Sequence, residues 1–91
     1  MQIVWSPQAE ETFDSIINFI INNWGVSASK NFIKKTKKLL ISIASMPQMF
    51  PETLLQNVRK AVITPQSSLF YEIREQEIWL LYFWDNRQEA L

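Results

Sequence analysis

The chain opens with a short apolar run and then a long helical repeat of apolar residues. The first run, Gln2–Trp5, is typical of a strand, and Ser6-Pro7 combines a helix-capping serine with a proline suited to the first helical position. Helical spacing of apolar residues then continues up to Gly25, the only glycine of the chain and a suitable residue to end a helix. We therefore predict a helix between these two signals. Its predicted buried face consists of Ala9, Phe13, Ile16, Ile17, Ile20 and Trp24.

A second helical repeat follows directly. It begins at about Val26 or Ser27 and ends at Ser45, because Pro47 disfavours helical backbone before it. Two helices joined by one tight break form an antiparallel hairpin. Four lysines fall within about 100° of one another on the outer face: Lys30, Lys34, Lys37 and Lys38. The predicted buried face holds Ala28, Phe32, Thr36, Leu39, Ile43 and Met46.

The second half of the chain contains three strand-like runs, at residues 58–63, 68–74 and 78–84. They are rich in β-branched and aromatic residues, which favour a pleated, partly buried sheet. In the last run, alternation places Ile78, Leu80, Tyr82 and Trp84 on one face and Trp79, Leu81 and Phe83 on the other. Apolar residues on both faces indicate a central strand. If the second face is exposed to solvent, Trp79 and Phe83 would form a contact surface there. We predict an α+β fold of order β-α-α-β-β-β, with a helical hairpin packed on one side of a mostly antiparallel, twisted sheet.

Composition narrows the chemistry. Residues 1–91 are expected to form one domain, since 47 % of them are hydrophobic and no linker or repeat divides them. Nine basic and nine acidic side chains give zero net charge, so we expect no direct binding of nucleic acid. The chain has neither cysteine nor histidine, which removes thiolate chemistry and the usual proton-transfer residue. No cofactor or metal is expected, and the lack of a signal peptide or an apolar span predicts a cytoplasmic protein.

A series of motifs resembles one family over nearly the whole chain. In order, the motifs are Trp5-Ser6-Pro7-x-Ala9, Trp24-Gly25, Ala28 with Phe32, Arg59, Phe70-Tyr71-Glu72-Ile73, Ile78-Trp79-Leu80-Leu81 and Asp85-Asn86-Arg87. The chain is similar to the RelE/ParE superfamily of type II toxins, on the ParE side. This resemblance implies a plasmid-stabilisation type of toxin, neutralised by a tightly bound ParD-like antitoxin in a hetero-oligomer. For ParE-like members it implies inhibition of DNA gyrase, and for RelE-like members ribosome-dependent cleavage of mRNA.

The RelE-like alternative requires a cluster of catalytic groups. Such cleavage needs a base or orienting group, a cation for the charged transition state and a proton donor. The residues that would supply them are Arg59, Lys60, Tyr71, Arg74 and Arg87, with Tyr82 as a second tyrosine. The run after the last strand has no histidine or tyrosine, and an acidic residue, Asp85, stands where an RNA phosphate would approach. We therefore predict a toxin that binds a protein target, with a nuclease, and a non-toxic binding module or co-repressor, as alternatives.

Two surfaces follow from the binding hypothesis. The expected target-binding residues are Arg59, Arg74, Asp85, Asn86 and Arg87, and the expected antitoxin-binding residues are Lys30, Lys34, Lys37, Lys38, Trp79 and Phe83. Structural interpretations stand beside these. Arg59 and Arg74 could pair with Glu72, Glu75 or Glu77 across neighbouring strands. Tyr71 could be a packing residue, Asp85-Asn86-Arg87 a polar strand exit, and the lysines a solvated face.

Overall fold

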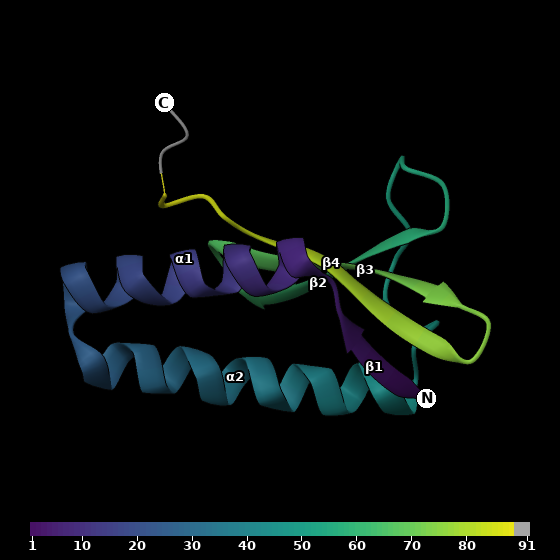
Figure 1. Cartoon of the computed structure of the whole chain (residues 1–91), viewed down its shortest axis with the longest axis horizontal. Helices are drawn as coiled ribbons and strands as arrows, with labels where there is room; N and C mark the ends of the chain where they lie inside the picture. Colours follow the sequence, from purple (N-terminus) through teal and green to yellow (C-terminus); the bar gives the residue numbers. More distant parts are fainter. Residues whose placement is uncertain (89–91) are drawn as a thin grey trace.

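A computed structural model describes residues 1–88, and it confirms the predicted order of elements (Figure 1). These are β1 (Gln2–Trp5), α1 (Pro7–Trp24), α2 (Val26–Ser45), β2 (Val58–Thr64), β3 (Ser67–Arg74) and β4 (Glu77–Asp85). Both ends of each of the three later strands lie within one residue of the predicted bounds. Neither helix in the described part of the chain combines the length and apolarity needed to cross a membrane.

The strands form one sheet in the order β1-β4-β3-β2. Strand β1 runs parallel to β4, whereas β4–β3 and β3–β2 are antiparallel. The sheet is therefore mostly antiparallel, and β4 is a central strand, as predicted. Figure 1 shows α1 and α2 lying side by side, with the connection between them at one end of the molecule.

Ser6 attaches the start of α1 to β4. Its hydroxyl oxygen accepts a hydrogen bond from the Ala9 N–H at 3.0 Å, which caps the helix, and the same hydroxyl donates to the Leu81 carbonyl at 3.0 Å. The Ser6 N–H also donates to the Leu80 carbonyl at 3.1 Å. Just beyond, the Ala9 side chain is fully buried. The Trp5-Ser6-Pro7-x-Ala9 motif is therefore a joint that fixes α1 against the sheet.

Gly25 connects the two helices. Its N–H donates to the Ile21 carbonyl at 2.9 Å, which ends α1, and its φ of 94° and ψ of 172° belong to a backbone region reserved for glycine. Because the next residue already begins α2, the hairpin is tight. The Phe13 and Phe32 rings then stack across it with centroids 6.0 Å apart.

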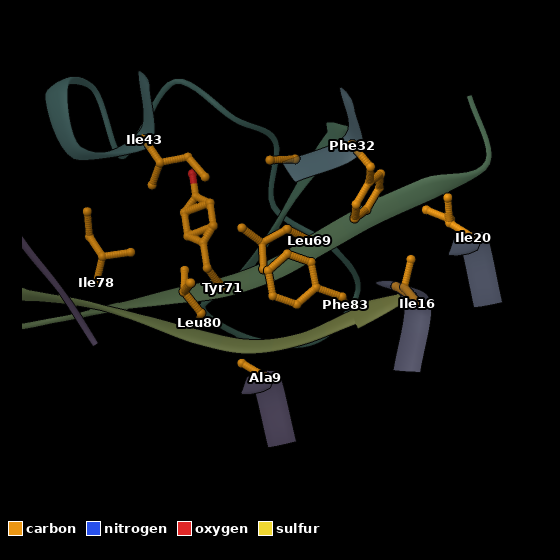
Figure 2. Close-up of a cluster of buried hydrophobic side chains, with 11 residues drawn as sticks. Ala9, Ile16, Ile20, Phe32, Ile43, Leu69, Tyr71, Ile78, Leu80 and Phe83 are labelled. Atoms are coloured by element: carbon orange, nitrogen blue, oxygen red, sulfur yellow. The ribbon is translucent and has the colours of Figure 1, made fainter. Parts of the chain in front are cut away.

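The core lies between the hairpin and one face of the sheet (Figure 2). Figure 2 shows the Tyr71 ring standing on the sheet and pointing toward Ile43 of α2. Burying a large aliphatic or aromatic side chain stabilises a fold by about 1.5–3 kcal/mol. The buried cluster consists of Ala9, Ile16, Ile20, Phe32, Ile43, Ala61, Leu69, Tyr71, Ile78, Leu80 and Phe83.

Two residues predicted on buried helix faces are exposed. Trp24 and Met46 are each 55 % exposed, so these predictions are wrong. Trp24 is the last residue of α1 and Met46 directly follows α2, so both lie where the helical spacing of apolar residues continues beyond the facing layer. The Trp24 ring packs edge-on against Phe19 at 5.8 Å, on its own helix. Met46 is the C-cap of α2 and has non-helical backbone, with φ −139° and ψ 72°.

Strand β4 carries a β-bulge that reverses its alternation. Phe70 of β3 pairs with Tyr82, but Tyr71 pairs with Leu80, so Leu81 is an extra residue. After the bulge, Phe83 faces the core and is 2 % exposed. The prediction that Phe83 lies on the same face of the sheet as Trp79 is therefore wrong, and so is the placement of Tyr82 and Trp84 on the face of Ile78.

Candidate functional site

The second face of the sheet carries a depression of about 620 Å³, whose lining includes the rings of Phe70, Tyr82 and Trp84. Its centre is a row across three strands, in which Lys60 pairs with Phe70 and Phe70 pairs with Tyr82. The Phe70 and Tyr82 rings stack with centroids 4.7 Å apart and planes 16° from parallel, and the Lys60 ammonium lies 6.0 Å from the Phe70 centroid. We call this surface the open face, and define it by Lys60, Val62, Phe70, Tyr82 and Trp84.

The next row of the open face is more exposed. Val62 pairs with Ser68, and Ser68 pairs with Trp84. Val62 is 59 % exposed and Trp84 is 50 % exposed. The indole N–H of Trp84 donates to the Asn86 side-chain oxygen at 2.8 Å, which holds the ring in place. Asn86, one of the predicted target-binding residues, therefore supports a Trp on this face.

Strand β4 borders this depression, and α1 covers the edge that β1 leaves free. Strand β1 pairs with β4 only as far as Leu80. The Phe83 N–H beyond that point donates to the Thr12 hydroxyl at 2.9 Å, and Thr12 lines the depression together with Gln8. A helix side chain therefore satisfies the Phe83 N–H, a backbone donor at the strand edge that could otherwise pair with another strand.

Arg74 and Trp79 lie together near the β3–β4 turn. The Arg74 guanidinium bonds the Glu72 carboxylate at 2.9 Å and lies 4.7 Å from the centroid of Trp79. The Trp79 indole donates to Glu77 at 3.0 Å. The predicted pairing of Arg74 with Glu72 is confirmed, although both residues belong to β3 rather than to neighbouring strands.

Arg59 fastens the segment between α2 and β2. Its guanidinium donates to the carbonyls of Phe50 at 2.6 Å and Gln48 at 3.2 Å, and it bonds the Glu52 carboxylate at 3.1 Å. The predicted pairing of Arg59 with Glu72, Glu75 or Glu77 is therefore wrong. The side chain lies on the core side of the sheet, since Arg59 pairs with buried Tyr71.

Tyr71, the nuclease candidate in β3, lies in the core. Its side chain is fully buried and its hydroxyl donates to the Pro47 carbonyl at 2.7 Å. Burial raises the pKa of the Tyr71 phenol, and the nearby Arg59 charge partly opposes that effect. The packing interpretation of Tyr71 accounts for this placement.

The strand exit folds back on itself at the other end of the sheet. The Asp85 carboxylate is buried and receives two hydrogen bonds from the Arg87 guanidinium, at 3.0 and 2.7 Å, and one from the Arg87 N–H at 2.8 Å. These bonds raise the pKa of Arg87, so its charge is fixed. The guanidinium also lies 5.2 Å from the Trp24 ring centroid.

The nuclease and target-binding candidates do not form one cluster. Arg59 and Tyr71 hold the segment after α2, Arg74 lies near the β3–β4 turn, and Arg87 lies beyond the opposite end of β4. Of these candidates, Lys60 and Tyr82 line the same depression on the open face. The four lysines predicted to contact an antitoxin are all exposed on α2.

Sequence reasoning did not place Phe70 and Trp84 together on the open face. The position of Phe70 was readable, because it neighbours Tyr71 in a strand and must face the other way. That of Trp84 was not, because it depends on the bulge. Among residues 1–88 there is no cluster of three or more His, Cys, Asp or Glu side chains that could hold a metal ion.

Comparison with known proteins identifies the family. The profile of a family described as ParE toxin of type II toxin-antitoxin system, parDE, matches residues 3–90. No curated protein sequence matches the chain. Similar solved structures include the chromosomal ParDE TA system from P. aeruginosa, with TM-score 0.80, 14 % identity and coverage of 93 % of this chain and 95 % of that chain.

Two further solved structures share the fold. The YoeB-YefM complex from Staphylococcus aureus has TM-score 0.64 and 21 % identity, and covers 92 % of this chain and 94 % of that chain. YafQ from E. coli strain BL21(DE3) has TM-score 0.58 and 15 % identity, and covers 94 % of this chain and 93 % of that chain. Because the family profile spans nearly the whole sequence, the protein belongs to the ParE toxins of type II toxin–antitoxin systems.

Proposed function

We propose that this toxin acts by binding a protein target through the open face, without cleaving RNA, and that an antitoxin neutralises it in a hetero-oligomer. The observation that carries the proposal is that the arginines are already paired with acidic side chains of the protein. Each of Arg59, Arg74 and Arg87 is in an ion pair with a carboxylate. A phosphoryl-transfer site needs cations that are aimed at the reacting phosphate and not neutralised by the protein.

The open face has the properties of a protein-binding surface. Tyr and Trp are enriched among the residues that contribute most to protein–protein binding, especially in concave, desolvated places. Tyr82, Phe70 and Trp84 form such a place, with Lys60 as a single cation beside them. One lysine is too little charge to track a nucleic-acid backbone, whose binding relies on several phosphate contacts.

The antitoxin proposal rests on the family and on charge. The family is the toxin of a toxin–antitoxin system, and one fold relative was solved as a YoeB-YefM complex. On this chain, α2 offers exposed lysines that an acidic partner would neutralise. The identity of the target rests on the ParE branch alone, and DNA gyrase is the target we propose to test first.

RNA cleavage is the second candidate, and one observation favours it. Lys60 and Tyr82 lie on either side of Phe70 in one row, so a cation and a phenol do come together on an aromatic platform. An RNA base stacked on Phe70 would bring its phosphate toward them. This candidate requires the Tyr82 hydroxyl, whereas the binding proposal requires only its ring.

Purified protein separates the two candidates. Gyrase supercoiling and cell-free translation are each measured with the wild-type protein and with Trp84→Ala. This variant is suitable because Trp84 is half exposed and lies outside the core. The proposal expects inhibited supercoiling, normal translation and a weaker effect of the variant. Blocked translation with normal supercoiling would support RNA cleavage. If both reactions are normal and induced expression does not slow growth, the protein is a non-toxic binding module.

A further inference from the structure

A second cleft, of about 390 Å³, lies at the end of the molecule where the two helices join. Its apolar lining comes from facing positions of the hairpin, Ile20 of α1 with Ala28 and Phe32 of α2. The β2–β3 turn closes one side through Gln66. The cleft is separate from the open face, with which it shares no lining residue.

Cations and an aromatic ring surround the mouth of this cleft. Lys35 of α2 and Arg87 both line it, and Trp24 forms a wall on which the Arg87 guanidinium lies. Buried Asp85 neutralises Arg87 at 2.7 Å, so Arg87 contributes shape and hydrogen-bond donors more than net charge. Lys35 is exposed, and within residues 1–88 every ion pair is made by an arginine.

Helix α2, which forms one side of the cleft, is strongly positive although the chain is neutral. Residues 15–51 contain five lysines and no aspartate or glutamate, and all five lysines lie on α2. The compensating acids lie elsewhere, in the first half of α1 and in the second half of the chain. Such segregation creates a local field that attracts an acidic partner and raises its association rate.

We propose that this cleft binds an acidic peptide segment of a partner protein, which inserts one apolar side chain between α1 and α2 and places its carboxylates on Lys35 and the adjacent lysines. The apolar side chain contributes affinity by filling the cleft, and the carboxylates raise the association rate and the specificity. Peptide fits better than nucleic acid, since Ile20, Ala28 and Phe32 give the cleft an apolar contact and buried Asp85 neutralises Arg87, the arginine in its lining.

Nuclear magnetic resonance with a defined probe tests this directly. The probe is a short peptide with leucine at helical spacing and glutamates between, and the control peptide has glutamine in place of every glutamate. Backbone signals of Ala28, Asn31, Lys35 and Gln66 should shift with the glutamate peptide, and shift much less with the glutamine peptide. Shifts centred on Phe70, Tyr82 and Trp84, or no binding, would overturn the proposal. A single-stranded RNA probe that competes at the same residues would overturn the choice of peptide.

Two exposed positions supply variants that spare the core. Asn31→Trp fills the mouth of the cleft, and Lys35→Glu reverses its charge; each should weaken binding of the glutamate peptide by about tenfold or more. Lys60→Glu makes the same charge change on the open face and should leave the affinity within about twofold. Equal losses in Lys35→Glu and Lys60→Glu would reduce the effect to overall charge and contradict a specific cleft.

The identification of this segment with the antitoxin rests on the proposed function. In cells, Lys35→Glu should remain toxic when expressed alone but lose rescue by the cognate antitoxin. Rescue equal to that of the wild type would mean that the antitoxin binds elsewhere. If the wild type itself is not toxic, the proposed function fails, while the peptide titration still decides whether the cleft binds acidic segments.

Discussion

The hydroxyl of Thr12 on α1 accepts a 2.9 Å hydrogen bond from the N–H of Phe83, the first core residue after the bulge in β4. The same hydroxyl donates back to the Gln8 carbonyl at 2.8 Å. One side chain therefore satisfies the strand edge where β1 has ended and also fixes the distance between α1 and β4.

Replacing Thr12 by valine should destabilise the fold. Valine keeps the shape and a similar helix propensity but leaves the Phe83 N–H without an acceptor, which costs about 1–3 kcal/mol. The measurement is the free energy of unfolding from urea denaturation. Thr12→Ser keeps the oxygen and should lose much less; a valine variant as stable as the wild type would mean that water replaces the hydroxyl.

The burial of Tyr71 should make the protein less stable at alkaline pH. Its pKa is raised in the folded state above the usual value of 10.0, so the folded protein holds the phenolic proton more tightly than the unfolded chain does. The resulting stability is fully present below pH 10 and is lost as the pH rises through the folded pKa. Tyr71→Phe also removes the bond to the Pro47 carbonyl and should cost about 0.5–1.5 kcal/mol near pH 7.

The difference between wild type and Tyr71→Phe should therefore narrow as the pH is raised above 10. Urea denaturation repeated from neutral to alkaline pH measures this difference, with Tyr82→Phe as a variant that keeps Tyr71. A gap that stays constant over this range would show that the Tyr71 proton is not linked to folding.

The Asp85–Arg87 pair should contribute more to stability than the Arg74–Glu72 pair. Arg87→Ala leaves the buried Asp85 carboxylate without its cation, at a cost of about 1–3 kcal/mol. Arg74→Ala breaks a more exposed pair and should cost less than about 1 kcal/mol. Thermal unfolding of both variants compares them, and a greater loss in Arg74→Ala would reverse this ranking.

The element boundaries could be predicted because local residues set them. Ser6-Pro7 starts α1, Gly25 separates the helices, and Pro47 follows the end of α2, each through backbone chemistry that acts within a few residues. Strand positions were readable for the same reason, from composition and from the turn at Pro65. Trp24 and Met46 were misplaced because helical spacing cannot tell where the facing layer stops.

The two faces of β4 could not be predicted past Leu81. The bulge lies where β1 ends and where Ser6, the N-cap of α1, and Thr12 of α1 attach to the β4 edge, and these are contacts between distant parts of the chain. Strict alternation therefore placed Phe83 outside and Trp84 with the core face. Only the resemblance and the residue types indicated a functional surface, and the binding surface that we propose is centred on Phe70, Tyr82 and Trp84 and not on the arginines.

The partners of the arginines were also beyond sequence reasoning. Arg59 binds backbone carbonyls of Gln48 and Phe50, and a carbonyl carries no sequence signature. Glu72, the partner of Arg74, was among the predicted ones, but it lies two residues away in the same strand and not across neighbouring strands. Long-range polar contacts of this kind decide which charges remain available to a ligand.

Two variants of the open face should differ in toxicity if the protein acts by binding. Trp84→Ala removes a half-exposed ring from the contact surface and should relieve growth inhibition, whereas Tyr82→Phe keeps the stacked ring and should be as toxic as the wild type. Removing a catalytic proton donor typically costs about 10²–10⁴-fold in rate, so RNA cleavage predicts the reverse for Tyr82→Phe. Growth after induced expression measures both variants, and unchanged unfolding free energies exclude a folding defect. A harmless but folded Tyr82→Phe protein would place the hydroxyl in the chemistry and reject the binding proposal.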